Sequence, residues 1–438
     1  MRTHGRITFA LAILVVLSLL LAACQSAPAP SAPAKAEAPK ASEPAKPAET
    51  KPVEQAKPAE QPKPVEPAKA ASKEPYKIGA SLPLSGPFAA PGMEMRDALQ
   101  MEIERFNAAG GVNGAPVELV VEDDGLDPTK AATAVTKLIR QDKVLAIAGP
   151  IGPGEVSGQP IAEREQVSMF ALSGGSPDVR AKKFKWSFNF LLSDLVSGEA
   201  MVEALKLKGY KKVAVIHEAD PYIEATVEAL KTVGTKEGIQ VLVLQDTVTV
   251  KDVDVTPQVL KLKDLIAREK PQAVAIVASG FATVPAAKAI RQMGIDLPLV
   301  GSPAVTAPAT FLVAGMEMDG MVTAGPKDVA GDQLPDSDPQ KPVIVDFMKR
   351  YQAKFNKPLF AGGNVAVDMF NILGNAMKVA GPDRAKIRDA IEKTTNYAGT
   401  GAVYTFGPDK HEGPLRQSAA IYQIDMKNKK FALLSTIK

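Results

Sequence analysis

The stretch VLAIAGPIGPGEVSGQPIAE, residues 144–163, joins an apolar segment to a helical one through a turn almost bare of side chains. Val144 to Ala148 predict a buried strand, and Gln159 to Glu165 predict the body of a helix. The turn between them includes the glycines Gly149, Gly152 and Gly154. Glycine allows a positive φ and close backbone approach, and a helix start offers N–H groups to an anion. The turn is therefore either an anion-binding site formed by backbone N–H groups or a tight turn between packed elements.

The same strand–turn–helix unit recurs on both sides of this stretch. Strand patterns alternate with helix patterns from Tyr76 onward: YKIGASLPL (76–84), GMEMRDALQMEIERFN (92–107), PVELVVEDD (116–124), LDPTKAATAVTKLIRQ (126–141) and VSMFAL (167–172). A helix from Ser157 to Glu165 is expected before the last of these strands. Asp127 is predicted as an N-cap, with Pro128 in the first turn of its helix. Strands separated by helices favour parallel sheets with helices on both faces.

A second block of the same kind begins after Phe190. Its strands and helices include KKVAVIHEAD (211–220), IEATVEALKTVGTKEG (223–238), QVLVLQDT (240–247) and AVAIVASG (273–280). Two blocks of over a hundred residues each predict two Rossmann-like α/β lobes. The helices after about Gly325 and the two last strands, SAAIYQID (418–425) and FALLST (431–436), must pack on one or both lobes.

The N-terminal segment has the pattern of an export signal. Arg2 and Arg6 precede an apolar run from Ile7 to Leu21, and LLAACQS follows at 20–26. A basic start before a short apolar run is typical of a signal peptide, here residues 1–23, and Cys24 is predicted to carry lipid. A chance cysteine after an ordinary signal is the alternative. Cys24 is the only cysteine, so we expect neither a disulfide within the chain nor a thiolate metal site.

Residues 24–75 are rich in Ala, Pro, Lys and Glu. Such a composition has too few apolar groups to offset the entropy of ordering. We expect a semi-extended tether of at most ~3.1 Å per residue, with cell-wall binding as an alternative use. The mature protein is then exported and held at a lipid bilayer through Cys24, in the periplasm or on the outer face of the cytoplasmic membrane, without spanning the membrane.

Composition and motifs exclude several classes of function. The 438 residues carry 52 Lys plus Arg against 49 Asp plus Glu, a net charge of +3. This near balance does not indicate the concentrated basic surface that binds nucleic acids. There is no Gly-x-Ser-x-Gly, no phosphate-binding loop, no His-Glu-x-x-His and no dinucleotide fingerprint after the first strand. His217 and His411 lie far apart, and EDDGLD (122–127) lacks calcium-loop spacing. We therefore expect no metal, no cofactor and no enzymatic activity; turnover with a cofactor would revive the alternative of an enzyme on a Rossmann-like scaffold.

What remains is a set of strand-to-helix turns, which is where open α/β sheets bind small molecules. Several are rich in glycine, and three aromatic side chains stand in or beside them: Phe88, Tyr222 and Phe281. Taken from two lobes, these turns describe two facing edges that could close on a ligand.

The chain resembles the type I periplasmic solute-binding proteins of ABC transporters, in the branched-chain amino-acid-binding (leucine/isoleucine/valine-binding-like) branch. The resemblance runs from about Lys77 to the C-terminus and rests on KIGASLPLSGPFAAPG, EIERFNAAGGVNG, LVVEDDGLDPTKAATAVTKLI, GPIGPGEVSGQPIAE and IRQMGIDLPLVGS, in that order. It implies two lobes joined by three crossovers that close over a solute. The lobes would be residues 76–190 with 326–420 and residues 191–325 with 421–438. It also implies a monomer that delivers its solute to an ABC permease in the cytoplasmic membrane.

The resemblance also assigns site residues. The ligand carboxylate would meet Gly152, Pro153 and Gly154, which offer it backbone donors but no hydroxyl group. The glycine-rich turn is therefore interpreted as an anion-binding site. The next loop falls on Gly174 and Gly175, flanked by Ser173 and Ser176. Tyr222 and Phe281 match second-lobe aromatic positions, and the family's ammonium-binding acidic residue falls on Pro303.

The proline at 303 bears on the ligand, because burying an ammonium without a carboxylate is costly. Either Glu155, Glu218 or Asp220 replaces the acid, or the ligand has no α-amino group, which is the preferred interpretation. The expected solute is then a small organic acid, aromatic or branched, or a neutral amide; a branched-chain amino acid stays open under the first interpretation. A ligand-sensing lipoprotein acting through a signalling partner and a non-binding envelope lipoprotein are the competing functions.

Overall fold

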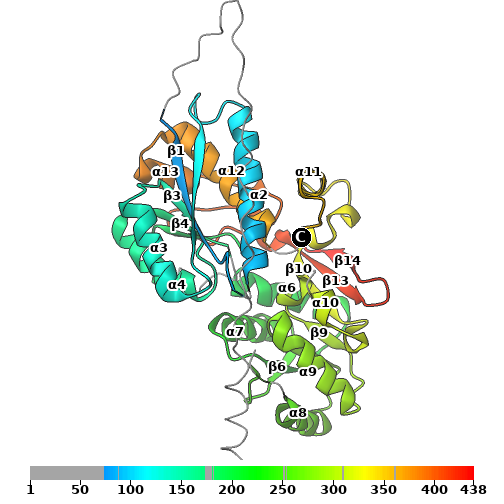
Figure 1. Cartoon of the computed structure of the whole chain (residues 1–438). Coiled ribbons are helices and arrows are strands. Elements are labelled where there is room, and N and C mark those ends of the chain that lie inside the picture. The colour runs from blue at the N-terminus through cyan, green and yellow to red at the C-terminus, as the bar shows by residue number, and fades with distance from the viewer. Residues whose placement is uncertain are drawn as a thin grey trace, which may run out of the picture. The chain divides into compact units, whose positions relative to one another are not determined.

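The computed structural model describes residues 74–86, 88–172, 180, 182–249, 252, 254–307, 310–359 and 362–438, and the backbone but not the side chain of Phe281. The predicted signal peptide, with Cys24, and nearly all of the predicted tether lie outside these residues. The described residues form two α/β lobes, each built on its own sheet (Figure 1).

The first lobe contains a five-stranded parallel sheet in the order β2-β1-β3-β4-β5. Its strands are β1 (Tyr76–Leu82), β2 (Val117–Asp123), β3 (Ala146–Ala148), β4 (Ser168–Ala171) and β5 (Ser187–Asn189). The helices between them are α2 (Ala89–Ala108), α3 (Pro128–Arg140) and α4 (Pro153–Glu165). Buried side chains of α3 and α4 pack on one face of the sheet, and those of α2 pack on the other.

Helix α3 begins as the sequence predicts. The Asp127 carboxylate accepts hydrogen bonds from the N–H groups of Thr129 (2.8 Å) and Lys130 (2.9 Å), and Pro128 is the first helical residue. The side chain thereby satisfies two N–H groups that the helix start leaves without partners. The predicted N-cap is confirmed.

The bare turn before α4 has a packing explanation. Gly149 has a φ of +77°, and a Cβ there would lie 2.3 Å from the Ser81 carbonyl oxygen. A Cβ on Gly154 would lie 2.8 Å from the Cβ of Ala131 on α3. The helix begins at Pro153, four residues before the predicted start at Ser157, because proline suits the first position of a helix. Close approach of the turn to β1 therefore requires Gly149, and close approach of α4 to α3 requires Gly154.

The second lobe contains a seven-stranded sheet in the order β14-β13-β10-β9-β8-β6-β7. The strands β6 (Lys212–His217), β7 (Gln240–Val243), β8 (Ala273–Val277), β9 (Leu299–Gly301) and β10 (Val322–Pro326) are parallel. The last two, β13 (Ala419–Asp425) and β14 (Lys430–Thr436), join antiparallel. Around them lie α6 (Asp194–Leu207), α7 (Pro221–Lys236), α8 (Thr256–Glu269), α9 (Gly280–Gln292), α10 (Thr310–Val313) and the 3₁₀ segments η1 (Pro303–Thr306), η2 (Met316–Met318) and η3 (Lys327–Gln333).

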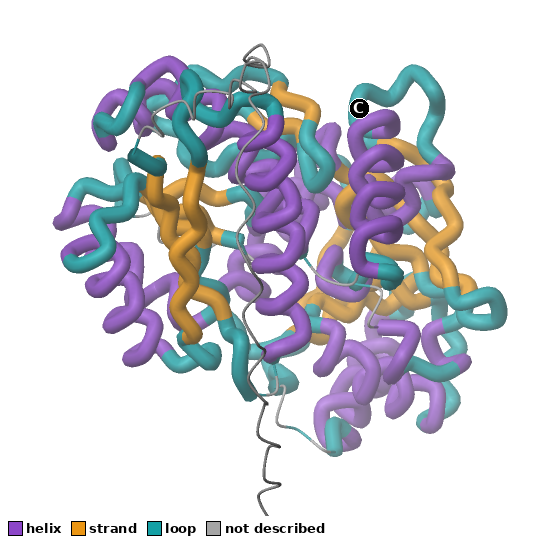
Figure 2. The backbone as a smooth tube through the Cα atoms, turned by 45° about the horizontal axis from the view of Figure 1, so that its top comes forward, coloured by secondary structure: helices purple, strands orange, loops and turns teal. Residues whose placement is uncertain are grey.

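Three late helices return to the first lobe: α11 (Lys341–Phe355), α12 (Gly363–Ala380) and α13 (Arg384–Ile391). Helix α12 packs beside α2, where Phe370 meets Phe106 edge to face at 5.3 Å. A short pair, β11 (Tyr397–Ala398) with β12 (Val403–Tyr404), and the segment η4 (Arg416–Ser418) complete the chain. Helices consequently flank both sheets (Figure 2).

The chain passes between the two sheets three times: after β5, after β10 and between β12 and β13. The first and third crossovers run side by side, because the Asn189 N–H donates to the His411 carbonyl (2.8 Å) and the Gly413 N–H donates to the Asn189 carbonyl (3.1 Å). At the second crossover, the Tyr422 hydroxyl donates to the Pro326 carbonyl (2.8 Å). The three passages between lobes are thus hydrogen-bonded to their surroundings.

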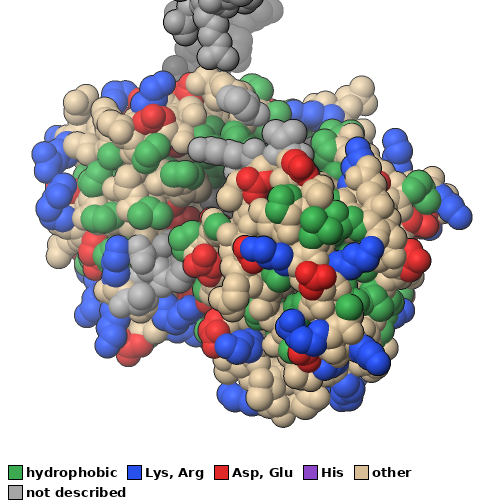
Figure 3. All heavy atoms as spheres, turned by 90° about the horizontal axis from the view of Figure 1, so that it is seen from below, with side chains coloured by type: hydrophobic (Ala, Val, Ile, Leu, Met, Phe, Trp, Pro, Cys, Tyr) green, Lys and Arg blue, Asp and Glu red, His purple; other side chains and the backbone are tan. Residues whose placement is uncertain are grey.

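Charged side chains of both signs are interspersed on the face drawn in Figure 3. Within the described residues, none of the helices combines the length and apolar character needed to cross a bilayer.

Candidate binding cleft

A cleft of about 740 Å³ is lined by both lobes and by the crossovers. Its volume lies within the range typical of small-molecule sites. The residues that line it are Met95, Leu172, Phe190, Leu191, Leu192, Tyr222, Pro303, Ala304, Thr306, Ala307, Pro326, Asp328, Val329, Gly331, Asp332, Ile344, Val345, Met348, Gln352, Pro358, Leu359, Gly362, Asn364, Val365, Gly401 and Ala402.

Most of the cleft wall is apolar. Met95 and Leu172 come from the first lobe, Ala304 comes from the second, and Leu191 and Leu192 belong to the first crossover. Aliphatic walls stabilise a ligand by removing its hydrocarbon surface from water. The cleft therefore suits a small solute with an apolar body.

The charge of the cleft wall has one sign. Among the described residues that line it, the charged ones are Asp328 and Asp332, and none is Lys, Arg or His. Asp332 is exposed, whereas Asp328 is largely covered. The described residues also contain no cluster of three or more His, Cys, Asp or Glu side chains that could hold a metal ion.

Asp328 lies in η3, directly after the second crossover strand. Its Oδ2 accepts a hydrogen bond from Asn364 Nδ2 at 2.8 Å, whereas its buried Oδ1 has no hydrogen-bond partner in the described structure. Burial raises the pKa of the Asp328 carboxyl to about 7, and the nearby Asp368 adds to the rise, against a lowering by the N–H groups of Asp328 itself and Val329. A carboxyl with this pKa is partly protonated at neutral pH.

Asp368 on α12, a neighbour of Asp328, accepts more hydrogen bonds than Asp328 does. It accepts hydrogen bonds from the Thr400 N–H (2.6 Å), the Thr400 hydroxyl (2.8 Å) and the Gly401 N–H (2.6 Å). Burial raises the pKa of Asp368 to about 6 although these bonds lower it. Because Asp368 is fully engaged with the 400–401 turn, its role is to fix the cleft wall at Gly401.

Tyr222 stands at the second-lobe edge of the cleft, at the start of α7. Its hydroxyl donates to the Leu192 carbonyl (2.9 Å) and lies 2.8 Å from the Ser197 hydroxyl. Burial raises the pKa of Tyr222 to about 12. The ring that faces the cleft is consequently held to the first crossover by its own hydroxyl.

Pro303 also lines the cleft, as the first residue of η1. The preceding Ser302 is buried, and its hydroxyl donates to the Ala278 carbonyl at 2.7 Å. This bond ties the turn after β9 to the end of β8. The structure thus brings Tyr222 and Pro303, two of the residues predicted from the sequence, to one cleft.

The other predicted site residues have different places. Gly152 and Pro153 are exposed, Gly154 is buried, and Phe88 is 40% exposed just before α2. None of these four is among the described residues that line the cleft. Ser173, Gly174, Gly175, Ser176 and the side chain of Phe281 lie outside the described residues. These assignments stay predictions.

The three acidic residues considered as ammonium partners are engaged elsewhere. Glu155 accepts a hydrogen bond from Gln159 Nε2 (2.9 Å), Glu218 accepts one from the Ser279 N–H (2.8 Å), and Asp220 caps α7. None of the three is among the described cleft-lining residues. Asp328 was not predicted because it follows β10, the strand that leads into the second crossover, and does not stand in a glycine-rich turn. The sequence signal that could have found it is the Pro-Lys-Asp at 326–328, where a strand ends beside a crossover.

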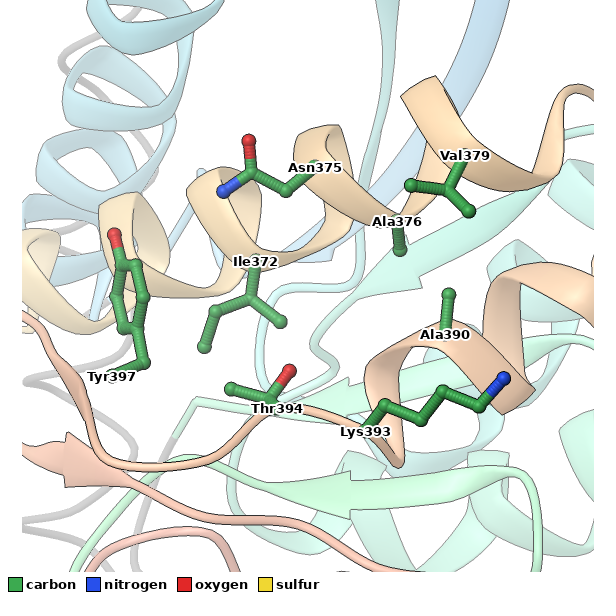
Figure 4. A pocket seen from close by; sticks show the side chains of 8 residues that line it. All are labelled: Ile372, Asn375, Ala376, Val379, Ala390, Lys393, Thr394 and Tyr397. Carbon is green, nitrogen blue, oxygen red and sulfur yellow. The ribbon is translucent and has the colours of Figure 1, made fainter.

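A second, smaller cavity of about 220 Å³ lies on the first lobe between α12 and α13. Figure 4 shows Ile372 and Ala376 of α12 facing Ala390 and Thr394 on the opposite side. This cavity shares no lining residue with the cleft in the described structure.

Comparison with known proteins gives the family. The family model of the periplasmic binding proteins matches residues 75–430. A leucine-, isoleucine-, valine-, threonine- and alanine-binding protein of Pseudomonas aeruginosa is 28% identical over 335 residues, covering 74% of this chain and 84% of that protein. The Leu/Ile/Val-binding protein of Escherichia coli is 24% identical over 284 residues, covering 64% of this chain and 73% of that protein.

Solved structures agree on the fold. A leucine-binding protein from Thermotoga maritima superposes with a TM-score of 0.70 at 23% identity and covers 83% of this chain and 98% of that chain. A branched-chain amino acid transporter substrate-binding protein from Streptococcus pneumoniae, in complex with isoleucine, gives 0.68 at 22% identity and covers 82% of this chain and 99% of that chain.

The prediction of two α/β lobes with parallel sheets flanked by helices is confirmed, as is the expectation of a binding protein rather than an enzyme. With the match spanning both lobes and every crossover, the chain belongs to the periplasmic binding protein family.

Proposed function

We propose that this protein is the extracytoplasmic solute-binding component of an ABC importer, and that it captures a small amino-acid-like solute or organic acid in the cleft. The observation that carries the proposal is the cleft itself, about 740 Å³ in volume and lined by both lobes and the crossovers. The names of the Pseudomonas and Escherichia relatives, which give leucine, isoleucine and valine for both and also threonine and alanine for the first, support the size and character of the solute.

In this proposal the lobes close over the solute by bending at the crossovers. Water leaves the apolar wall when the hydrocarbon part of the solute packs against it. Tyr222 connects the solute to the first crossover through its hydrogen bond to the Leu192 carbonyl (2.9 Å). A closed state that buries the solute presents a different surface to a permease than the open state does, which is how delivery would be signalled.

The predicted division of the chain belongs to the same proposal. Residues 76–190 with 326–420 form the first lobe, and residues 191–325 with 421–438 form the second. The N-terminal signal and the tether would hold these lobes at a bilayer through lipidated Cys24. Cys24→Ser should release the protein from the membrane fraction of expressing cells and abolish incorporation of labelled palmitate.

Isothermal titration calorimetry and a thermal-shift screen test the binding proposal. The panel consists of branched-chain amino acids, aromatic acids and small amides. A ligand at 100 times its dissociation constant should add ~2.7 kcal/mol to the free energy of unfolding. A protein that gives no heat and no shift across the panel would refute solute binding of this class.

A variant pair locates the site. Ala304→Trp places a large ring in the cleft wall and should abolish the thermal shift. Val379→Trp is the matched control, because Val379 is 84% exposed and lines the other cavity. Equal binding by both variants would show that the cleft is not the site.

A further inference from the structure

The cleft carries negative charge that the described structure does not balance. Asp328 and Asp332 face it, and no described Lys, Arg or His lines it. The nearest cation along the chain, Lys327, is already engaged: its Nζ lies 2.6 Å from Asp338 Oδ2, and both side chains are buried. A carboxylate in a largely apolar wall without a cation is unfavourable, so either the carboxyl takes up a proton or a cation that enters the cleft pairs with it.

We propose that Asp328 binds the ammonium group of the solute, and that the solute is therefore an apolar amine or amino acid rather than a simple organic acid. This inference rests on the proposed function, and it replaces the preference for a ligand without an amino group.

The hydrogen bonds of Asp328 support this assignment. Asn364 Nδ2 donates to Oδ2 at 2.8 Å and holds the carboxylate in place, and because Oδ1 is buried, Oδ2 is the oxygen that a solute in the cleft would meet. An ammonium supplies both a positive charge and up to three donors, and no described Lys, Arg or His of the cleft wall offers Asp328 a positive charge. Charge-assisted hydrogen bonds of this type are among the strongest available to a small ligand.

The apolar residues around Asp328 indicate the chemical character of the rest of the solute. Ile344, Val345 and Met348 from α11 and Val329 from η3 line the cleft, as do Pro303 and Ala304 from the second lobe. Burial of a branched hydrocarbon body against these side chains contributes ~25 cal/mol per Å² of apolar surface. Ammonium recognition and apolar packing would thus act on opposite ends of one small molecule.

The protonation of Asp328 then sets the pH dependence of binding. Asp368 on α12 raises the pKa of Asp328, and the Asp328 charge in turn raises the pKa values of Tyr404 on β12 and Tyr422 on β13. Lys327 and Asp332 belong to η3 itself, and Lys327 is paired with Asp338. With a pKa of about 7 for Asp328, only the ionised fraction pairs with an ammonium. Affinity should fall about tenfold from pH 8 to pH 6.

Three probes of one hydrocarbon shape separate the charges: L-leucine, 3-methylbutylamine, which lacks the carboxylate, and 4-methylpentanoate, which lacks the ammonium. Calorimetry of the purified full chain measures each one for the wild type, for Asp328→Asn and for Asp336→Asn. Asp336 is the matched control, since its side chain is 97% exposed a few residues further along the chain and does not line the cleft.

The wild type should bind L-leucine and 3-methylbutylamine at least tenfold more tightly than 4-methylpentanoate. Asp328→Asn should lose that preference and the pH dependence while binding 4-methylpentanoate no more weakly than the wild type, which also shows that the variant is folded. Asp336→Asn should behave as the wild type.

Tight binding of 4-methylpentanoate, or an Asp328→Asn variant that keeps the preference for the amine, would overturn the role of Asp328 and leave the proposed function standing. Failure of all three probes to bind the wild type would refute both proposals for solutes of this shape.

Discussion

Replacement of Lys327 by methionine should destabilise the protein strongly. Lys327 and Asp338 form a buried ion pair at the second crossover, with 5% and 6% of their side chains exposed and 2.6 Å between Nζ and Oδ2. Methionine keeps most of the hydrocarbon stem but removes the charge, so it leaves the Asp338 carboxylate buried without a cation. Breaking a buried pair in this way costs ~3–5 kcal/mol. Asp338 keeps one hydrogen bond, from the Gln340 N–H at 3.0 Å, so we expect a loss near the lower end, about 3 kcal/mol.

Urea unfolding followed by far-ultraviolet circular dichroism measures the free energy of unfolding. Lys341→Met is the matched control, because its partner Asp336 is 97% exposed and surface pairs contribute at most about 1 kcal/mol. The double variant Lys327→Met/Asp338→Leu should recover much of the loss, since it leaves no buried charge. A loss below 1 kcal/mol for Lys327→Met, or a double variant as unstable as the single one, would refute the reasoning.

Three further predictions concern the cleft and the bare turn. Tyr222→Ala should weaken solute binding at least tenfold without unfolding the protein, because it removes a cleft-lining ring and its bond to Leu192; calorimetry with unchanged affinity would show that the ring is not at the site. Gly154→Ala should cost ~1–3 kcal/mol by overpacking α4 against Ala131. Gly280→Ala, whose nearest atoms would be 3.6 Å away, should be neutral in the same urea titration; equal losses would contradict the packing argument. Asp328→Asn should raise the free energy of unfolding of the ligand-free protein, and by more at pH 8 than at pH 5. The folded-state pKa of about 7 exceeds the unfolded 3.8, so the wild type gains stability as the pH falls from 7 towards 3.8; a gain of equal size at both pH values would contradict this sign.

Much of the fold follows from periodic patterns along the chain. The alternation of apolar runs with helical segments predicts the parallel strands of both lobes, and the Asp127–Pro128 pair predicts the start of α3 to the residue. The start of α4 was predicted late because glycine and proline are read as turn residues, whereas Gly154 lies inside the helix to let it approach Ala131. The antiparallel entry of β13 and β14 depends on contacts between distant segments, which a local pattern does not contain.

The cleft was predicted less completely than the fold. Tyr222 and Pro303 follow the carboxyl ends of parallel strands, which is where α/β proteins bind their ligands. Asp328 has the same kind of position but looks like an ordinary charged residue in a loop. Only the structure shows that Asn364 meets one of its oxygens and that the other lacks a partner. The burial of a single oxygen atom leaves no mark in the composition or spacing of the sequence.

The pairing of Asn189 with His411 and Gly413 has a consequence for motion between the lobes. Two chain segments joined by backbone hydrogen bonds bend together more easily than they slide past each other, since sliding would break both bonds. The lobes should therefore rotate about one axis rather than twist freely. Spin-label distances recorded across the cleft at two separate positions would then change in proportion to each other on addition of solute.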